Sequence, residues 1–311
     1  MRKTENTGVI VDCLYDSGRD TPFGWRKDRP GGGSKPECRT GWIDIKKRRL
    51  NEVKKKAVSF LMAVCLVISA GVPYAGSVVS EAAANLEEGL VGHWDFEDGE
   101  LTNKVSGSGY TAEKIGNGVT LKSDGGVSGG SAYFSKEADS CIKLSQILNA
   151  AEDDFTIAAW VKYDSDAFDG TNDNMNLFQQ SGDGKTILFL RKSDTKYGTF
   201  LTGSNSLCDN STELGTWNHV AVTSNHSTKQ VQFYQNGSLV NTNTLSGDFV
   251  NAVTDVLIGN HKSLTASTAI KGSVDELRYY NTVVSADTVK AMYDEFAPAI
   301  QLETLKSELE A

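Results

Sequence analysis

A turn between two short alternating runs constrains the fold of this chain more than any other feature. Gly215–Leu245 reads GTWNHVAVTSNHSTKQVQFYQNGSLVNTNTL, three short runs in which apolar and polar residues alternate. The last two runs flank Asn236 and Gly237, the dipeptide that most readily supplies the two positive φ angles of a type I′ hairpin turn. A period of two places successive side chains on opposite faces of a strand. We therefore predict an antiparallel meander whose strands each have one buried face.

The same pattern recurs through the C-terminal two thirds of the chain. Leu90–Glu97 is the expected first strand, and Phe155–Tyr163 is the strongest strand pattern after it. Shorter strands are expected at 119–121, 132–135, 141–144, 177–179, 187–191, 198–201, 253–258 and 270–280. Links rich in Gly, Ser and Asn separate them, and strands do not alternate with helices. The sequence predicts an all-β fold, a two-sheet antiparallel sandwich or jelly roll, rather than a parallel sheet.

One short helix is expected after the last strand. Ser285 is placed to cap it, and the helix carries an apolar stripe at i, i+3, i+4 and i+7 that can pack on the sandwich. The stripe consists of Val289, Met292, Tyr293 and Phe296. Pro298 is expected to interrupt the helix. A second helical pattern then starts, so residues 298–311 are interpreted as a linker or as the front of a following domain.

Charge divides the chain into two parts. Residues 1–75 carry 15 Lys and Arg against 8 Asp and Glu, a net charge of +7, whereas the whole chain carries −9. Residues 76–311 therefore carry −16. Nucleic-acid affinity comes mainly from Lys and Arg, so a nucleic-acid partner is not expected for this acidic part. The composition is typical of a soluble extracellular protein and compatible with a divalent cation.

Residues 53–75 have the pattern of a secretory signal peptide. Lys54–Lys56 precede the apolar segment Ala57–Val72, and small residues follow near Ala75, where cleavage is expected. The apolar segment is shorter than the roughly 18–20 residues that comfortably span a bilayer. An uncleaved signal anchor is the alternative, and it is the only expected contact with a membrane. The predicted localisation is secreted or on the extracellular cell surface.

The regions beside the signal peptide are assigned by exclusion. Residues 1–52 have no sustained hydrophobic period and are interpreted as disordered, or as lying upstream of the true translation start. Residues 76–89 are expected to be a linker, and residues 90–297 to be the folded domain. Within the exported part, Cys141 and Cys208 are the only cysteines; they could form a disulfide or stay reduced, and no Cys/His cluster indicates zinc.

Four motifs resemble, in order, the laminin G-like jelly roll of the concanavalin A-like lectin/glucanase superfamily. They are GLVGHWDFEDG, DDFTIAAWVKYD, LGTWNHVAVT with FYQNGSLV, and GSVDELRYYNTVVSADTV. Each is weak alone, but four in the right order are specific, and together they span Leu90–Phe296. The resemblance implies a two-sheet jelly roll that places the first and last strands side by side. It also implies an accessory module of secreted bacterial enzymes or adhesins, often carbohydrate-binding and often holding a structural calcium.

The resemblance points to a cation site formed by Glu97, Asp98 and Asp275. Calcium takes hard oxygen ligands, commonly carboxylates and backbone carbonyls, and these residues stand where the family's motifs tend to supply them. Solvated turn carboxylates are the alternative interpretation. A sugar-binding site also needs an exposed aromatic ring. If Trp94, Trp160 and Trp217 are structural, that ring or its polar neighbours must come from other groups: Tyr163, Tyr197, Phe168 or the loop 172–176.

Catalysis is not expected within this domain. The glucanases of the superfamily set their two carboxylates at alternating positions of one strand, as ExDxE or ExDxxE, and no such run occurs here. Asp275 and Glu276 are adjacent and are expected to point to opposite faces, and the histidines show no HExxH spacing. The favoured interpretation is a non-catalytic glycan-binding module, whose parent protein could carry a glycoside hydrolase domain downstream. The alternative is a cell-surface adhesion or protein-interaction module.

Overall fold

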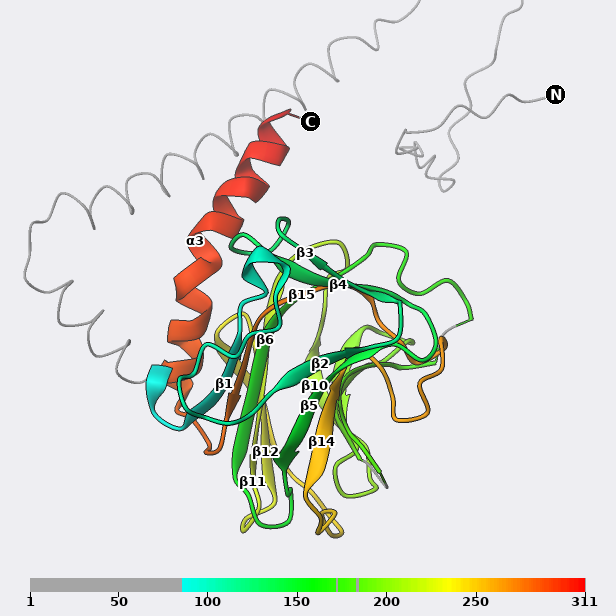
Figure 1. Cartoon of the computed structure of the whole chain (residues 1–311), viewed down its shortest axis with the longest axis vertical. Coiled ribbons are helices and arrows are strands. Elements are labelled where there is room, and N and C mark those ends of the chain that lie inside the picture. The colour runs from blue at the N-terminus through cyan, green and yellow to red at the C-terminus, as the bar shows by residue number, and fades with distance from the viewer. Residues whose placement is uncertain (1–85, 172, 183–184, 311) are drawn as a thin grey trace, which may run out of the picture. The chain divides into compact units, whose positions relative to one another are not determined.

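Two antiparallel sheets packed face to face make up the described part of the chain. The computed structural model describes residues 86–171, 173–182 and 185–310, and Figure 1 shows the sheets with one long helix beside them. The expected signal peptide, the N-terminal extension and most of the linker fall outside these residues. Within them, no helix is long and apolar enough to cross a membrane.

The first sheet has eight strands, and the second has seven. In spatial order the first contains β13 (Ser238–Thr244), β12 (Gln230–Gln235), β11 (Asn218–Asn225), β6 (Phe155–Tyr163), β15 (Lys271–Tyr280), β4 (Ser131–Ser135) and β3 (Val119–Lys122), with β1 (Leu90–Trp94) paired to β15. The second contains β10 (Ser206–Ser211), β9 (Lys196–Thr199), β8 (Thr186–Leu190), β7 (Met175–Gln180), β14 (Thr254–Ile258), β5 (Cys141–Leu148) and β2 (Ala112–Ile115). The predicted two-sheet sandwich is confirmed.

The hairpin that fixed the architecture forms as predicted. Asn236 and Gly237 have φ angles of 49° and 75°, the two positive values of a type I′ turn. The turn joins β12 to β13 and pairs Gln235 with Ser238. The predicted strand Phe155–Tyr163 is also confirmed, with the same bounds as β6. Two strands were not predicted, β2 and β10, whose sequences AEKI and SLCDNS show little apolar alternation.

The first and last strands lie side by side, as the resemblance implied. β1 runs antiparallel to β15, with Trp94 opposite Leu277 and His93 opposite Arg278. β15 pairs with β6 on its other side, so the end of the domain occupies the middle of the eight-stranded sheet. This pairing brings the opening and closing motifs of the sequence to one place.

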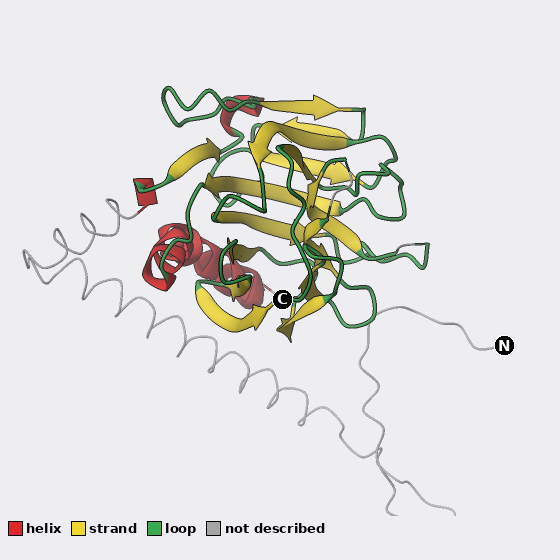
Figure 2. Cartoon of the chain, turned by 90° about the horizontal axis from the view of Figure 1, so that it is seen from below, coloured by secondary structure: helices red, strands yellow, loops and turns green. Residues whose placement is uncertain are grey.

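Helix α3 (Ala286–Glu310) covers the outer side of the eight-stranded sheet, as Figure 2 shows from a second direction. The Ser285 hydroxyl accepts the Thr288 backbone N–H at 3.1 Å, which confirms the predicted cap. Val289 and Met292 pack on Ala221 of β11 and on neighbouring strands. Because of this cover β11 is buried on both faces, so the prediction of a single buried face is wrong for this strand.

The predicted break at Pro298 is also wrong. Pro298 lies inside α3, which continues to Glu310 and is therefore longer than the expected short helix. Proline lacks the N–H that would bond the carbonyl four residues earlier, and this normally kinks or ends a helix. Here the ring is exposed, while Ala297 and Ile300 on either side of it pack in a cluster around Trp160. Packing on both sides of the proline explains why the helix continues.

The two cysteines of the domain are not bonded. Both are buried free thiols, Cys141 on β5 and Cys208 on β10. These strands are five positions apart in the seven-stranded sheet, which corresponds to about 24 Å at ~4.8 Å per strand. A disulfide needs Cα atoms less than about 7 Å apart. The structure therefore resolves the two alternatives in favour of free thiols, and burial raises the pKa of Cys141 to about 11.

Candidate functional site

The carboxylates expected to hold a cation lie where β1 ends and where β15 is irregular. Glu97 and Asp98 begin the 3₁₀ helix η1 (Glu97–Gly99), directly after Phe96, which has a φ of 51°. On β15 the register shifts after Asp275, and Glu276 has a φ of 50°. Non-glycine residues rarely adopt such positive φ angles, and they concentrate at functional sites. Both unusual residues stand next to a predicted ligand.

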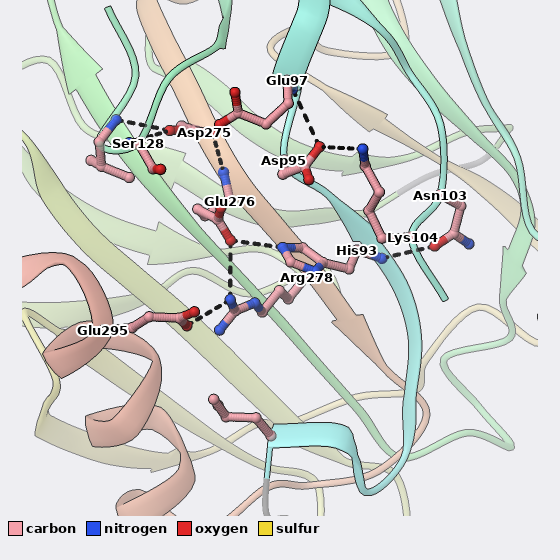
Figure 3. Close-up of polar contacts among 12 residues, drawn as sticks. His93, Asp95, Glu97, Asn103, Lys104, Ser128, Asp275, Glu276, Arg278 and Glu295 are labelled. Carbon is pink, nitrogen blue, oxygen red and sulfur yellow. Dashed lines mark hydrogen bonds and ion pairs between the residues drawn. The ribbon is translucent and has the colours of Figure 1, made fainter. Parts of the chain in front are cut away.

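Asp275 is fully buried and its carboxylate accepts three backbone N–H groups. Val127 and Ser128 donate to Oδ2 at 2.8 and 3.4 Å, and Glu276 donates to Oδ1 at 2.7 Å. Burial, followed by the neighbouring Glu276 carboxylate, raises the pKa of Asp275 to about 8. Figure 3 shows Asp275 reaching toward Ser128. The buried carboxylate thus anchors the loop between β3 and β4.

Glu97 approaches the same loop from β1. Its Oε2 accepts the Gly130 backbone N–H at 3.2 Å. A Cβ atom at Gly129 would lie 2.1 Å from Glu97 Oε2, and one at Gly126 would lie 2.5 Å from Asp275 Oδ2. Only glycine lets the loop come this close to the two carboxylates. The structure therefore brings Glu97 and Asp275 together on loop 126–130.

These groups match calcium in donor type but not yet in number. Calcium takes six to eight oxygen ligands. Two carboxylates and a glycine-rich loop with backbone carbonyls supply hard oxygens, whereas the side chain of Asp98 lies outside the described residues. Among the residues described, no three His, Cys, Asp or Glu side chains gather as a ready metal group. The calcium site therefore stays a prediction.

Glu276 belongs to a different network, beside the first one in Figure 3. Its Oε2 contacts His93 Nε2 at 2.7 Å and accepts from Arg278 Nη2 at 3.0 Å, and Arg278 also donates to Glu295 of α3 at 2.8 Å. Burial opposes the charge of Arg278, but the Glu295 and Glu276 carboxylates outweigh it and raise its pKa. Sequence reasoning did not find this network, which ties β1, β15 and α3 together.

The tryptophans in the described part are structural. Trp94 and Trp160 are 0% and 1% exposed, and Trp217 is half-buried against the cluster around Trp160. Trp160 lies under α3, with its ring 5.5 Å from the stacked ring of Tyr293 and 5.5 Å from the ring of His219. His219 is buried here, and burial, followed by the charge of Arg278, lowers its pKa to about 3. A neutral, enclosed imidazole is a packing group, as its strand position suggested.

The proposed sugar platforms are mostly buried. Tyr163 and Tyr197 are 0% and 2% exposed, so neither ring can stack on a ligand, and Phe168 packs half-buried against the core. In the loop expected to help them, Asn174 is exposed and Asn176 is buried. Phe200, directly after β9, is 36% exposed. Among the described Phe, Tyr and Trp side chains it is the only exposed one, and the others are buried or half-buried.

Fixed polar groups lie beside Phe200. Its backbone N–H donates to the Thr186 carbonyl at 2.8 Å, which continues the ladder between β9 and β8. The Thr186 hydroxyl contacts Gln179 Oε1 at 2.7 Å and Asn176 Oδ1 at 3.1 Å, both on β7. The Lys185 ammonium stands 5.5 Å from the centre of the Phe200 ring. An exposed ring, an ammonium group and bonded amides therefore gather at one end of the seven-stranded sheet.

Comparison with known families agrees with this architecture. A laminin G family model, described as the concanavalin A-like lectin/glucanases superfamily, matches residues 136–290. The domain belongs to the concanavalin A-like lectin/glucanase superfamily. A comparison with curated proteins gives no match.

Solved structures of other lectin-like domains share the fold. Domain 4 of AbnA, an extracellular arabinanase from Geobacillus stearothermophilus solved in complex with arabinotriose, is 18% identical with a TM-score of 0.52. The match covers 66% of this chain and 98% of that domain. The binding domain of Paraclostridial Mosquitocidal Protein 1 is 16% identical over 68% of this chain, with a TM-score of 0.53. The binding domain of botulinum neurotoxin serotype G is 16% identical over 66% of this chain, with a TM-score of 0.51.

These likenesses show the fold of this lectin-like domain and not its ligand. The chain spans about half the length of the two toxin binding domains, 53% and 51%. Domains of this lectin-like type are usually non-catalytic. In this one, the two adjacent carboxylates of β15 are held in separate contacts, Asp275 by loop 126–130 and Glu276 by His93 and Arg278.

Proposed function

We propose that this domain is a non-catalytic carbohydrate-binding module of a secreted or cell-surface bacterial protein. The observation that supports this most is Phe200, an exposed ring directly after β9 with the Lys185 ammonium beside it. The flat apolar face of a sugar ring stacks on an aromatic face, and a few fixed polar groups set its orientation. The eight-stranded sheet exposes less surface to a ligand, because α3 covers its outer side.

The ammonium group near Phe200 suits the hydroxyl groups of a sugar. Thr186, Gln179 and Asn176 are themselves buried and hold one another in place, so they fix β7 against β8 and are not proposed as ligand contacts. Lys185 is a hydrogen-bond donor beside the ring. An arabinanase domain of the same fold, solved with arabinotriose, makes arabinotriose a reasonable first ligand to try.

Binding without cleavage fits the carboxylates. Glycoside hydrolysis needs an acid and a second carboxylate facing one sugar bond, about 5 to 10 Å apart. Asp275, Glu276 and Glu97 are instead occupied with backbone N–H groups or with His93 and Arg278. We propose that the domain brings a larger carbohydrate-active protein to its substrate, and that any catalysis belongs to another domain of that protein.

Titration of the purified chain with arabinotriose, xylotriose, cellotriose and mannotriose tests the proposal. We expect one of these to bind, and Phe200→Ala to weaken that binding by about tenfold or more, because stacking on an aromatic ring is lost. Leu239→Ala removes a more exposed apolar side chain, on β13, and should leave the affinity unchanged. Binding to a surface or matrix protein, with no affinity for any glycan, would favour the adhesion alternative instead.

We further propose that Glu97, Asp98 and Asp275 hold a structural calcium ion at loop 126–130. Convergence of Glu97 and Asp275 on one glycine-rich loop supports this, as do the positive φ angles of Phe96 and Glu276 beside them. A bound cation would stabilise the ionised form of Asp275, whose charge burial otherwise disfavours. Its role would be to fix the loop against β1 and β15.

A further inference from the structure

A polar recess lies at one edge of the sandwich, away from Phe200. It has a volume of about 480 Å³ and is lined by Asp209, Asn210, Ser211, Gln235 and Asn236. The first three residues belong to β10, the edge strand of the seven-stranded sheet. The other two lie at the hairpin between β12 and β13, at the edge of the eight-stranded sheet. The recess therefore sits on the seam where the two sheets meet.

Amide side chains hold this seam together. Gln235 Nε2 donates to the Ser211 carbonyl and to the Thr212 hydroxyl, both at 3.3 Å. Asn241 and Asn243 of β13 both donate to the Leu207 carbonyl of β10, at 3.0 and 3.2 Å. The two walls of the recess are thus fixed relative to each other before any ligand arrives.

The hairpin wall is rigid as well. Asn236 exchanges two hydrogen bonds with His219: its backbone N–H donates to the His219 carbonyl at 2.8 Å, and its Oδ1 accepts the His219 N–H at 2.9 Å. A Cβ atom at Gly237 would lie 2.9 Å from the side chain of Tyr293, so α3 supports the turn from behind. A preformed wall loses little conformational entropy on binding.

The β10 wall supplies groups that are still available. The side chains of Asp209, Asn210 and Ser211 are exposed and make no side-chain hydrogen bond within the described part of the chain. A carboxylate accepts, an amide both donates and accepts, and a hydroxyl does either. This mixture matches neighbouring hydroxyl groups on a sugar ring. It does not match an apolar ligand, because every lining residue is polar.

We propose that this recess is a second glycan-binding site, which takes one or two sugar units through their hydroxyl groups. The inference rests on the proposed carbohydrate function and adds a second binding site to the domain. The volume lies within the range of about 300–1,000 Å³ that is usual for small-molecule sites. No lining residue is aromatic, so recognition is by hydroxyl pattern and not by stacking, and the site is weaker than the one at Phe200.

The experiment compares variants by titration of the full chain with the same four trisaccharides. Production in a bacterial host keeps Asn210 and Asn236 unmodified, since both stand in N-glycosylation acceptor sequences. We expect Asp209→Asn combined with Asn210→Ala to weaken the second binding event about tenfold, since hydrogen bonds to a charged group are the strongest in the recess. Asp287→Asn makes the same charge change at the start of α3 and should have no effect.

The outcomes separate this inference from the function on which it rests. Loss of the weaker event in the Asp209 and Asn210 variant, with the Phe200-dependent event intact, supports the second site. Binding that depends on Phe200 alone, in a single event unaffected by the recess variant, overturns the second site and leaves the module a glycan binder. If none of the four trisaccharides binds the full chain, the carbohydrate function and the second site fail together.

Discussion

His219 illustrates how packing changes the chemistry of a single side chain. Its imidazole is enclosed by Trp160 and Tyr293, and burial lowers its pKa to about 3. An unfolded histidine has a pKa of about 6.5. Between about pH 6.5 and about pH 3 the histidine is protonated in the unfolded chain and neutral in the folded chain, so the folded state loses stability as the pH falls.

We predict a pH dependence that follows from this difference. The contribution of His219 is fully present above about pH 6.5 and falls by up to ~1.4 kcal/mol per pH unit below it. The variant His219→Phe keeps a ring in the cluster but cannot bind a proton. Denaturant titrations between pH 7 and pH 4 give the free energy of unfolding at each pH. Its slope against pH should correspond to about one proton fewer for the variant than for the wild type. Equal slopes for both proteins would mean that the native site accepts the proton.

At the residue scale, the sequence indicated which carboxylates lie close together but not which aromatic ring is exposed. Glu97 and Asp275 do meet at one loop, because Glu97 follows β1 closely and Asp275 lies within β15, the strand that pairs with β1. Phe200 was missed because alternation does not tell which face of a strand is solvated. For the same reason Tyr163 and Tyr197 stood among the alternatives with no choice made between them, and both are buried.

Helix α3 acts as the cover of the eight-stranded sheet, and Tyr293 is its main contact with Trp160. We predict that Tyr293→Ala lowers the free energy of unfolding by about 2–3 kcal/mol, because a large ring leaves a cavity over Trp160. Tryptophan emission should shift to the red and become more sensitive to iodide.

Tyr133→Ala is the matched control for this variant. Tyr133 is a half-buried tyrosine on β4, with the Lys122 ammonium 4.0 Å from its ring centre. The control should leave the tryptophan emission unchanged. The same emission in wild type and Tyr293→Ala would show that α3 does not protect Trp160.

At the element scale, the central strands and the hairpin were predictable, whereas two edge strands and the continuation of the helix through Pro298 were not. β6 is central and strongly patterned, and its bounds agree with the prediction. β2 and β10 are edge strands, which bury less surface and so carry little apolar pattern. The general rule for proline predicts a break at Pro298, but the tertiary contacts of Ala297 and Ile300 hold the helix together there.

The whole domain should respond to removal of calcium. We expect a chelator to lower the melting temperature by several degrees, since a ligand that binds only the folded state adds stability. Asp275→Asn should abolish the difference between chelator and added calcium. Glu137→Gln, an exposed carboxylate outside loop 126–130, should preserve it. Identical melting curves for the wild type with and without chelator would contradict the proposed calcium site.

Thiol chemistry should confirm the distance between β5 and β10. We predict that the domain, unfolded without reductant, reacts with a thiol reagent at both Cys141 and Cys208. In the folded protein the same reaction should be slow, because burial raises the pKa of both thiols. A count below two on unfolded monomer would contradict the placement of these strands.

The arrangement of the whole domain was predictable from the order of the family-like motifs and not from local patterns. Alternation indicates strands but does not specify which strands pair. The pairing of β1 with β15 came from the resemblance, and the structure confirms it. The pairing of β15 with β6 on its other side was not predicted. The seam recess joins residues from two sheets, so no stretch of sequence indicates it.

The pairing of β1 with β15 also sets the order of events during synthesis. His93 and Glu276 are 183 residues apart, yet they touch across neighbouring strands. Contacts between such distant parts of a chain form slowly, because a long loop must close first. The nascent polypeptide cannot complete its eight-stranded sheet until β15 has left the ribosome, so this domain matures only after its last strand has been synthesised.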